Sequence, residues 1–385
     1  MKEYQQRQEA VQRYFQGERV TTIACSIGKS RKWVHHWINR YQAKHKDSDW
    51  YKDESKAPKK TNRVLPQEVE QQILLIRNEL ANEKMAQTGA ISIQYEFEKR
   101  GIKPPPAIWT INRVIAKYGL NKQASVHKTP KEYPDLSWHT HQIDLVGPRY
   151  IKGDGRFYSI NLIDTTTHSC FVKAVRTKSS DGIVEAIALF WQTHGMPDTL
   201  QMDNELAFRG SNRYPRSFGS VVRFALSQGV APIFIPVKEP WRNGIIEKFN
   251  DTYGKRFLQA YTFKNLEELS ACEQSFIDFH NTYHRYSSHG HKTPNEVKAL
   301  LLPPVYYHGN IHSQKKIPLT EGCVYFIRFI RSDLKLYLPN ESFVLIQELK
   351  YSYVVAEINI ANHTLIIRQN GEIKQIFSYQ VPVDW

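Results

Sequence analysis

The order of apolar patterns in the middle of the chain most constrains its fold. Three strand-like segments, HTHQIDLVG, FYSINLID and CFVKAVRT, follow one another, and each is rich in β-branched and aromatic residues. A helix pattern over 180–195 comes next, followed by a short strand, a helix and another strand. Two further helices are expected from about 244 to 259 and from about 265 to 283. Three consecutive strands followed by alternating helices and strands predict a mixed α/β domain over 135–300.

Residues 1–46 predict three short helices. Thr21 and Thr22 are positioned to cap the second helix, Gly28 to turn the chain, and Ser30 to cap the third. The apolar residues of the third helix recur at helical spacing and are Val34, Trp37, Ile38 and Tyr41. Two short helices joined by a glycine turn and followed by a basic helix are typical of a helix-turn-helix DNA-binding domain.

The outer face of the third predicted helix is basic and polar. Its residue types suit phosphate contacts and the reading of base edges, so we expect DNA contacts from Lys29, Arg31, Lys32, His35, His36, Asn39 and Arg40. Residues 1–63 carry 15 lysines and arginines against seven acidic residues, and the whole chain has a net charge of +14. This concentration of charge favours a polyanionic partner. The alternative is an ordinary three-helix bundle with a solvated basic face.

A second helical domain is predicted over 66–120. Its last helix turns Arg113 and Lys117 outward, where they are further candidates for DNA contact. The region is similar to a second helix-turn-helix, and a plain helical spacer is the alternative. Polar linkers are expected over 47–65, which is rich in lysine, and over 121–134.

The last part of the chain, residues 305–385, predicts short strands separated by turn signals. One of these signals is Asn370-Gly371, a pair typical of tight hairpins. A small β-barrel is the expected fold. Its charge is nearly balanced, with eight basic against seven acidic residues over 301–385, so charge does not make it a DNA-binding domain.

Other features of the sequence restrict the class of protein. The four cysteines form no CxxC pair, which argues against a disulfide framework and a cysteine zinc site. The polar N-terminus does not resemble a secretory signal. No apolar run reaches the roughly 18–20 residues of a membrane span. We therefore expect a cytoplasmic protein with no membrane partner.

Three acidic residues are candidates for catalysis. Asp144 lies within the first strand and Asp203 ends the fourth, while Glu239 and Glu247 compete for the third position. Two strand aspartates and one helical glutamate suit two Mg²⁺ ions, which prefer carboxylate oxygens and stabilise both oxygens of an in-line phosphoryl displacement. Asp164, at a strand end, is expected to form a turn.

These residues resemble the retroviral-integrase-like core of DDE transposases, which has an RNase H-like fold. The resemblance rests on Asp144, on Asp203-Asn204 and on the motif PWRNGIIEKFN at 240–250. The segment FHNTYHRYSSHGHKTPNEV at 279–297 is similar to the end of this core in bacterial insertion-sequence transposases. The similarity covers about 135–297. One departure is Glu205, which directly follows Asn204 where the family often has a glycine.

The resemblance selects the third carboxylate. Thirty-five residues separate Asp203 from Glu239, the spacing familiar in this family, whereas 43 separate it from Glu247. In the family, however, the catalytic glutamate follows an Asn-Gly pair, and Asn243-Gly244 precedes Glu247. Glu247 also lies on a predicted helix, whereas Glu239 lies in a loop before a proline. The eight extra residues match a polar loop insertion at 210–217, GSNRYPRS.

The resemblance implies a multidomain DNA transposase or integrase. It would bind transposon ends, cleave them to free 3′-OH groups and join these to target DNA, with Asp144, Asp203 and Glu247 holding two Mg²⁺ ions, or Mn²⁺ in their place. The expected partners are double-stranded DNA, further copies of the chain and an accessory ATPase, and the bound protein would associate with the nucleoid. Further candidates for DNA contact are Trp241, Arg242, Lys248 and Asn250; loop fixing or plain surface positions are the alternatives.

Two other functions remain open. One is a non-catalytic DNA-binding regulator derived from a transposase, and the other is a nuclease that cuts without joining. A zinc site is not expected, because the pair His35-His36 and the histidines of 280–291 lack cysteine partners. These histidines are expected to contact DNA or solvent.

Overall fold

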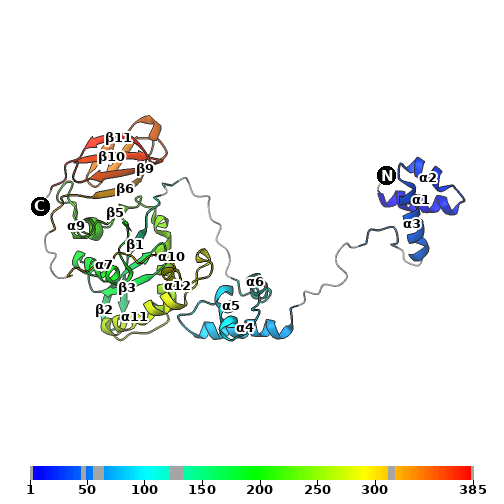
Figure 1. Cartoon of the computed structure of the whole chain (residues 1–385), viewed down its shortest axis with the longest axis horizontal. Coiled ribbons are helices and arrows are strands. Elements are labelled where there is room, and N and C mark those ends of the chain that lie inside the picture. Colours follow the sequence, from blue (N-terminus) through cyan, green and yellow to red (C-terminus); the bar gives the residue numbers. More distant parts are fainter. Residues whose placement is uncertain are drawn as a thin grey trace. The chain divides into compact units, whose positions relative to one another are not determined.

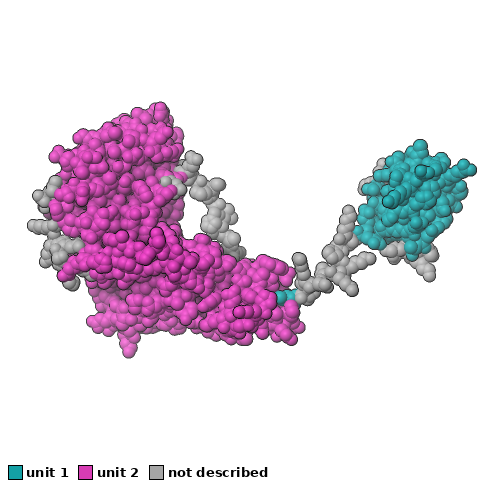
Figure 2. All heavy atoms as spheres, in the orientation of Figure 1, with its two compact units in different colours: residues 1–65 teal, residues 66–385 magenta. Residues whose placement is uncertain are grey.

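The chain divides into two compact units, residues 1–65 and 66–385 (Figure 2). The predicted linkers 47–65 and 121–134 lie largely outside the described residues. The computed structural model describes residues 3–44, 49–54, 65–121, 133–134, 136–310 and 317–382.

The first unit consists of helices α1 (Glu3–Phe15), α2 (Val20–Ile27) and α3 (Arg31–Lys44) (Figure 1). The hydroxyl of Ser30 accepts a hydrogen bond from the amide of Trp33 at 3.2 Å, so the predicted cap of α3 is confirmed. The capping role expected for the two threonines is wrong, because α2 begins at Val20 and includes them. The three helices share one core, formed by Ala10, Val11, Ile23, Ala24, Val34, Trp37 and Ile38.

The second unit begins with three helices that pack on one another. These are α4 (Gln67–Asn82), α5 (Ala90–Lys99) and α6 (Ile108–Lys117), and their inward residues include Ile73, Phe97 and Ile111. Side-chain contacts connect this helical part with the α/β core. The amide of Gln87 bonds the ring of His284, and the guanidinium of Arg285 lies 3.8 Å from the ring centre of Tyr95.

The centre of the second unit is the mixed sheet that the sequence predicts. Its first three strands are consecutive antiparallel neighbours, and the next two are parallel to the first. They are β1 (Thr140–Ile151), β2 (Gly155–Asp164), β3 (Cys170–Val175), β4 (Thr199–Met202) and β5 (Ala231–Phe234). Together with the helices on both faces this arrangement is an RNase H-like α/β fold, as expected.

Helices cover the two faces of this sheet. One face packs against α7 (Ser180–His194) and α9 (Ser220–Ser227), where Ile143 and Leu145 of β1 enter the largest apolar core. The other face packs against α10 (Gly244–Tyr253), a π-helical turn that continues it, and α11 (Leu266–Tyr283). The alternation of a strand assigns Gln142 and Asp144 to this second face.

The closed β-barrel predicted for the C-terminal part is not confirmed. The strands there are β6 (Cys323–Phe329), β7 (Lys335–Leu338), β8 (Glu341–Val344), β9 (Tyr353–Asn359), β10 (Thr364–Gln369) and β11 (Glu372–Ser378). Strand β6 pairs in parallel with β5, so one nine-stranded sheet runs from the C-terminal strands into the core, in the order β11-β10-β9-β6-β5-β4-β1-β2-β3. The apolar core is shared as well, because Phe326 stacks on Phe234.

The predicted turn of the last hairpin is present. Asn370 and Gly371 have φ angles of 51° and 83°, which the mirror-image tight turn requires and which a glycine adopts without steric cost. This turn connects β10 to β11 at the outer edge of the sheet.

The loop at 210–217, which the resemblance predicts to be an insertion, is held by the C-terminal strands. The guanidinium of Arg216 donates to both carboxylate oxygens of Glu341, at 2.7 and 3.0 Å. The side-chain amide of Asn340 donates to the carbonyl oxygen of Asn212 at 2.8 Å. The extra residues between Asp203 and the next long helix therefore form a contact with the β7–β8 turn.

Candidate active site

Asp144 is held in place by a chain of polar side chains. The amide of Asn250 in α10 donates to one carboxylate oxygen of Asp144 at 2.6 Å, and the backbone amide of Leu145 donates to the other at 2.9 Å. The amide of Asn161, the residue paired with Asp144 across β2, donates to Asn250 at 2.8 Å, and the hydroxyl of Ser159 donates to Asn161 at 2.6 Å. These bonds fix the rotamer of the carboxylate.

Asp203 follows the last residue of β4. One oxygen of its carboxylate accepts the backbone amide of Glu205 at 2.8 Å, which orders the turn in which Asn204 lies. The amide of Asn204 donates to the carbonyl oxygen of Ile235 at 2.7 Å, at the end of the neighbouring strand β5. The side chain of Glu205 forms an ion pair with Lys178.

The N-terminus of α10 is attached to the sheet by side-chain amides. The oxygen of Gln142 accepts the backbone amide of Ile246 at 3.0 Å, which satisfies one of the free amides of the first helical turn. The amide of Gln201 donates to the side-chain oxygen of Asn243 at 3.0 Å, and Asn243 is buried. Asn243 therefore attaches the start of α10 to the sheet. The first turn of this helix carries Glu247, whose side chain is exposed.

The three carboxylates interact electrostatically. Burial raises the pKa of Asp203 above its usual value, and the charge of Asp144 raises it further. Burial and the charge of Asp144 likewise raise the pKa of Glu247. The pKa of Asp144 is raised by its own burial and by the charge of Glu205, against the hydrogen bonds that it accepts. Three elements thus bring together carboxylates that repel one another, and a divalent cation relieves such repulsion.

Glu239 makes different contacts. Its carboxylate accepts a hydrogen bond from the hydroxyl of Tyr353 in β9 at 2.6 Å and pairs with the guanidinium of Arg242 at 3.2 Å. Arg242 also donates to the hydroxyl of Tyr353 at 3.1 Å, and its guanidinium lies 4.0 Å from the ring centre of Tyr133. Glu239 and Arg242 therefore fix the loop before α10, and Arg242 is largely covered.

The remaining candidates for DNA contact lie in two groups by exposure. In the first unit Arg31, Lys32, His35, His36 and Asn39 are exposed. Lys29 and Arg40 are partly buried, and Arg40 donates to the carbonyl oxygen of Lys52 at 2.6 Å.

In the second unit the candidates differ in how far their side chains are engaged. Arg113, Lys117, Trp241 and Lys248 are exposed, with Lys117 paired to Glu70 at 2.6 Å. The side-chain nitrogen of Asn250 donates to Asp144, and its side-chain oxygen accepts from Asn161. Its contacts therefore support a role in orienting the carboxylate.

The histidines near the end of the core are not all solvated. His280 is 1% exposed and His284 is 6% exposed. The ring of His284 stacks on Tyr286, and a ring nitrogen of His280 lies 3.0 Å from the hydroxyl oxygen of Tyr286. The expectation that they contact solvent or DNA is wrong, because α11 turns them into the core beside the aromatic residues of α10. Asn281, from the same motif, bonds the backbone amide and carbonyl of Cys170 and ties α11 to the edge strand β3.

The sequence also missed the side chains that support the carboxylates. Asn161, Gln142 and Gln201 are polar residues within otherwise apolar strands, and that exception to the pattern was the available signal.

Asp144, Asp203 and Glu247 do not have ligand atoms that all lie within 4.8 Å of one another. Over the residues that the structure describes, the only group of three or more that meets this distance is His139, His141 and Asp164.

Comparison with known proteins identifies the class of this core. Residues 228–294 match the family model described as "Integrase core domain", which spans β5, α10 and α11. This match confirms the resemblance to the integrase-like DDE transposase superfamily. Residues 5–58 match a second model, described as "Putative ATPase subunit of terminase (gpP-like)". No curated protein matches the sequence.

Solved integrase structures are also similar to parts of the chain. The catalytic core domain of HTLV-2 integrase in complex with magnesium is 16% identical, with 42% of this chain and 95% of that chain covered and a TM-score of 0.32. The simian T-cell lymphotropic virus intasome in complex with the PP2A regulatory subunit B56 gamma is 12% identical, with 76% and 94% covered and a TM-score of 0.36. The catalytic core domain of BIV integrase is 13% identical, with 42% and 94% covered and a TM-score of 0.32.

None of the described helices is long and apolar enough to cross a bilayer.

Proposed function

We propose that the chain is a DNA transposase of the bacterial insertion-sequence type, which cleaves transposon ends and joins them to target DNA. The observation that carries this proposal is the convergence of Asp144, Asp203 and Glu247 from β1, the end of β4 and the start of α10. Carboxylate oxygens from two strands and a helix suit hard divalent cations, and their raised pKa values are those of ligands that a cation would stabilise.

The residues of this site would have different roles. Asp144, Asp203 and Glu247 would hold two Mg²⁺ ions, for which Mn²⁺ would substitute. When bound, such ions activate the attacking oxygen and neutralise the leaving one in an in-line displacement at phosphorus. Asn250 orients Asp144 through its hydrogen bond, and Gln142 keeps α10 against the sheet. Water is the nucleophile for cleavage, and the freed 3′-OH is the nucleophile for joining.

The N-terminal helices would supply recognition of the transposon ends. The exposed basic face of α3 suits the major groove as the second helix of a helix-turn-helix, with phosphate contacts from Arg31 and Lys32. Lys248 and Trp241, which are both exposed, would contact the DNA end. Joining two ends requires further copies of the chain, and an accessory ATPase is a further proposed partner.

The experiment that tests this function compares three variants in a strand-transfer assay on labelled transposon ends with Mg²⁺. The DNA on either side of the gene is searched for inverted repeats, which then serve as the ends. Asp203→Asn and Glu247→Gln remove one charge each from the site, so both are expected to lower joining at least a thousandfold while binding of the ends is retained. Glu239→Gln is the matched control, since its carboxylate bonds Tyr353 and Arg242, and a loss of less than tenfold is expected.

Two outcomes would overturn the proposal. Full joining activity in Asp203→Asn would refute the site. Binding of the ends by the native chain with no metal-dependent nicking or joining would indicate the alternative function, a DNA-binding regulator. Nicking without any joined product would indicate a nuclease.

A further inference from the structure

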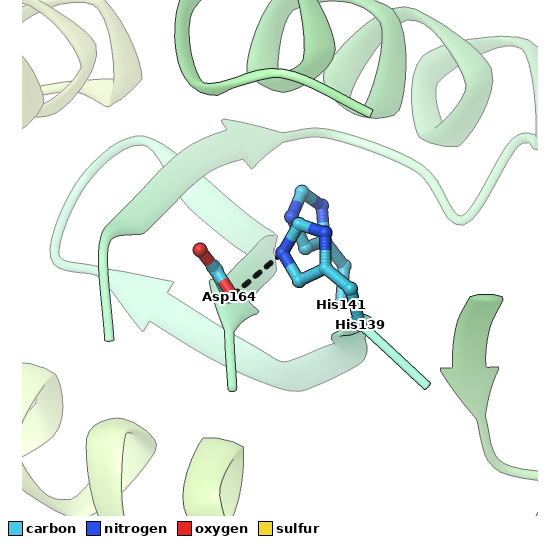
Figure 3. A group of neighbouring side chains, drawn as sticks. All are labelled: His139, His141 and Asp164. Carbon is cyan, nitrogen blue, oxygen red and sulfur yellow. Dashed lines mark hydrogen bonds and ion pairs between the residues drawn. The ribbon is translucent and has the colours of Figure 1, made fainter. Parts of the chain in front are cut away.

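A second cluster of potential metal ligands lies at the start of β1. Figure 3 shows His139, His141 and Asp164 with their side chains turned toward one another. A ring nitrogen of His139 lies 3.1 Å from a carboxylate oxygen of Asp164. One ligand atom from each of the three residues lies within 4.8 Å of the other two. The ligand types differ from those of the carboxylate site, because two of the three side chains are imidazoles.

His141 is the least satisfied member of this cluster. Its side chain is fully buried, and among the described residues neither of its ring nitrogens has a hydrogen-bond partner. A buried polar group without a partner costs about 1–3 kcal/mol, so such groups are rare unless something binds them. Burial also lowers the pKa of His141 to about 3, which keeps the ring in the neutral form that binds metals.

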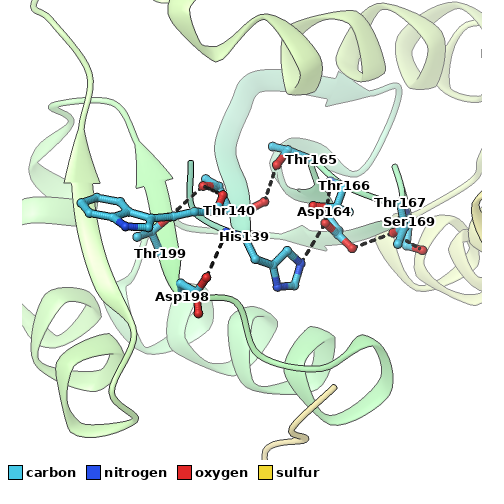
Figure 4. A network of polar contacts seen from close by, with 10 residues as sticks. His139, Thr140, Asp164, Thr165, Thr166, Thr167, Ser169, Asp198 and Thr199 are labelled. Carbon is cyan, nitrogen blue, oxygen red and sulfur yellow. Dashed lines mark hydrogen bonds and ion pairs between the residues drawn. The ribbon is translucent and has the colours of Figure 1, made fainter. Parts of the chain in front are cut away.

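Asp164 is held as a ready anionic ligand. Its carboxylate accepts the backbone amide of Thr166 at 2.8 Å and the hydroxyl of Thr167 at 2.7 Å (Figure 4). The hydrogen bonds from His139 and Thr167 keep its pKa well below the usual value, although burial acts in the other direction. Hydrogen bonds of this kind orient a metal-ligating carboxylate. The turn expected at Asp164 is therefore present, and the turn leaves the carboxylate facing two histidines.

The spacing of these atoms fits a small transition-metal ion. Two ligands that are each 2.0–2.1 Å from a tetrahedral zinc ion lie about 3.3 Å apart. The 3.1 Å between His139 and Asp164 is close to this value, and a ligand atom of His141 lies within 4.8 Å of both. Imidazole ligands favour zinc and its neighbours, whereas magnesium prefers oxygen ligands only.

We propose that His139, His141 and Asp164 form a binding site for a divalent transition-metal ion of the zinc class, separate from the carboxylate site. His141 pairs with Asp164 across β1 and β2, and its ring packs against Phe190 of α7. The site therefore lies on the α7 face of the sheet, while Asp144 lies on the α10 face. A bound ion would join the start of β1 to the end of β2 and stabilise the sheet without taking part in phosphoryl transfer.

One cation of the chain interacts electrostatically with this site. The charge of Lys298 interacts with Asp164, and its ammonium group donates to the carbonyl oxygen of Thr193 at 3.0 Å. Removing that charge is therefore expected to strengthen the binding of a dication. The proposal therefore predicts one variant that binds the metal ion more tightly. A variant that had merely lost its fold would not show tighter binding.

The test measures zinc binding to the full chain after removal of metals with a chelator. Zinc is titrated by calorimetry in millimolar Mg²⁺, which saturates oxygen-only sites, and the rise in the unfolding temperature is recorded in parallel. One zinc ion per chain is expected for the native sequence. His139→Ala and Asp164→Asn are expected to weaken binding at least tenfold, and Lys298→Gln to strengthen it severalfold. His308→Ala, at an exposed histidine, is the matched control and should bind as the native chain does.

Cobalt provides a second measurement. Visible absorption of bound Co²⁺ at tetrahedral intensity, lost in Asp164→Asn and kept in His308→Ala, supports the assigned ligands. Absence of stoichiometric zinc binding would overturn the proposal, and so would equal binding by His139→Ala, Asp164→Asn and the native chain. Because strand transfer is not the readout, failure of the proposed transposase activity leaves this test intact, and the reverse also holds.

Discussion

The guanidinium of Arg328, in β6, donates to the side-chain oxygen of Asn204 at 2.6 Å. Asn204 directly follows Asp203, so a residue of the C-terminal strands holds the turn that presents a proposed metal ligand. The other nitrogens of Arg328 donate to the carbonyl oxygens of Ile235, at 3.0 Å, and Tyr337, at 3.1 Å. Arg328 is only 7% exposed, and its burial lowers its pKa to about 10. It is a positioning residue for Asp203.

Replacing Arg328 should therefore impair the proposed site through Asn204. Arg328→Lys keeps the charge but has a single nitrogen, which does not replace the three separate nitrogens that bond Asn204, Ile235 and Tyr337. We expect strand transfer to fall at least tenfold and the Mg²⁺ concentration for half-maximal activity to rise, with the circular dichroism spectrum retained. Arg331→Lys, at an exposed position of the same segment, is the control. An unchanged Mg²⁺ requirement in Arg328→Lys would contradict the positioning role.

Without metal, Asp203→Asn should stabilise the fold. The folded-state pKa of Asp203 is raised above its ordinary value of 3.8. A raised carboxyl pKa contributes stability that is present below the unfolded pKa and is lost as pH rises through the folded pKa, so at pH 7 the ionised group is a net cost. Removing it is expected to raise the unfolding temperature by about 1–4 °C in chelator. The native chain should gain more stability from added Mg²⁺ than the variant; an equal gain would count against Asp203 as a ligand.

The buried histidines predict loss of stability in mild acid. Burial lowers the pKa of His141 and His284 to about 3 and that of His194 to about 4. The unfolded chain binds these protons near pH 6.5 and the folded chain does not, so stability is lost as pH falls from about 6.5 toward 4. Each histidine contributes a slope of about 1.4 kcal/mol per pH unit.

Chemical denaturation at several pH values measures this slope. His284→Gln should lower it by about one proton, since the glutamine does not titrate. His35→Gln, at an exposed position of α3, serves as the control and should leave the slope unchanged. A slope in His284→Gln equal to that of the native chain would show that this histidine stays protonated or exposed.

The exposed basic face of α3 should determine the salt dependence of DNA binding. Replacing both Arg31 and Lys32 with alanine removes two phosphate contacts in the proposed complex. The slope of log affinity against log salt concentration should become shallower by about 2. Lys335→Ala, an exposed lysine of the second unit, should have no such effect. Fluorescence anisotropy at several salt concentrations measures it, and an unchanged slope would indicate a solvated surface.

Local patterns in the sequence were sufficient to predict the core elements. The β-branched and aromatic residues of three consecutive segments predicted β1, β2 and β3. The 3.6-residue period of Ile246, Phe249 and Tyr253 predicted α10, because these residues form its buried face. The Asn370-Gly371 turn was predictable for a similar reason, since its backbone angles depend on the two residues themselves.

Features that depend on distant contacts were not predictable. The pairing of β6 with β5 connects residues about 90 positions apart, and the sequence of neither strand indicates which strand will pair with it. The burial of His280 depends on Phe249 of α10, and that of His284 depends on Tyr286 and on Gln87 of the helical part. The role of Asn161 emerged only with the register that sets it opposite Asp144.

The contact between Arg216 and Glu341 joins a short insertion to a turn 125 residues further along the chain. Each segment would leave a charge unmatched if the other were replaced. We therefore expect the loop and the turn to have been acquired together, and to have changed together, during evolution. A chimaera that takes its last 80 residues or so from a relative without the insertion should regain solubility only when the loop at 210–217 is replaced as well.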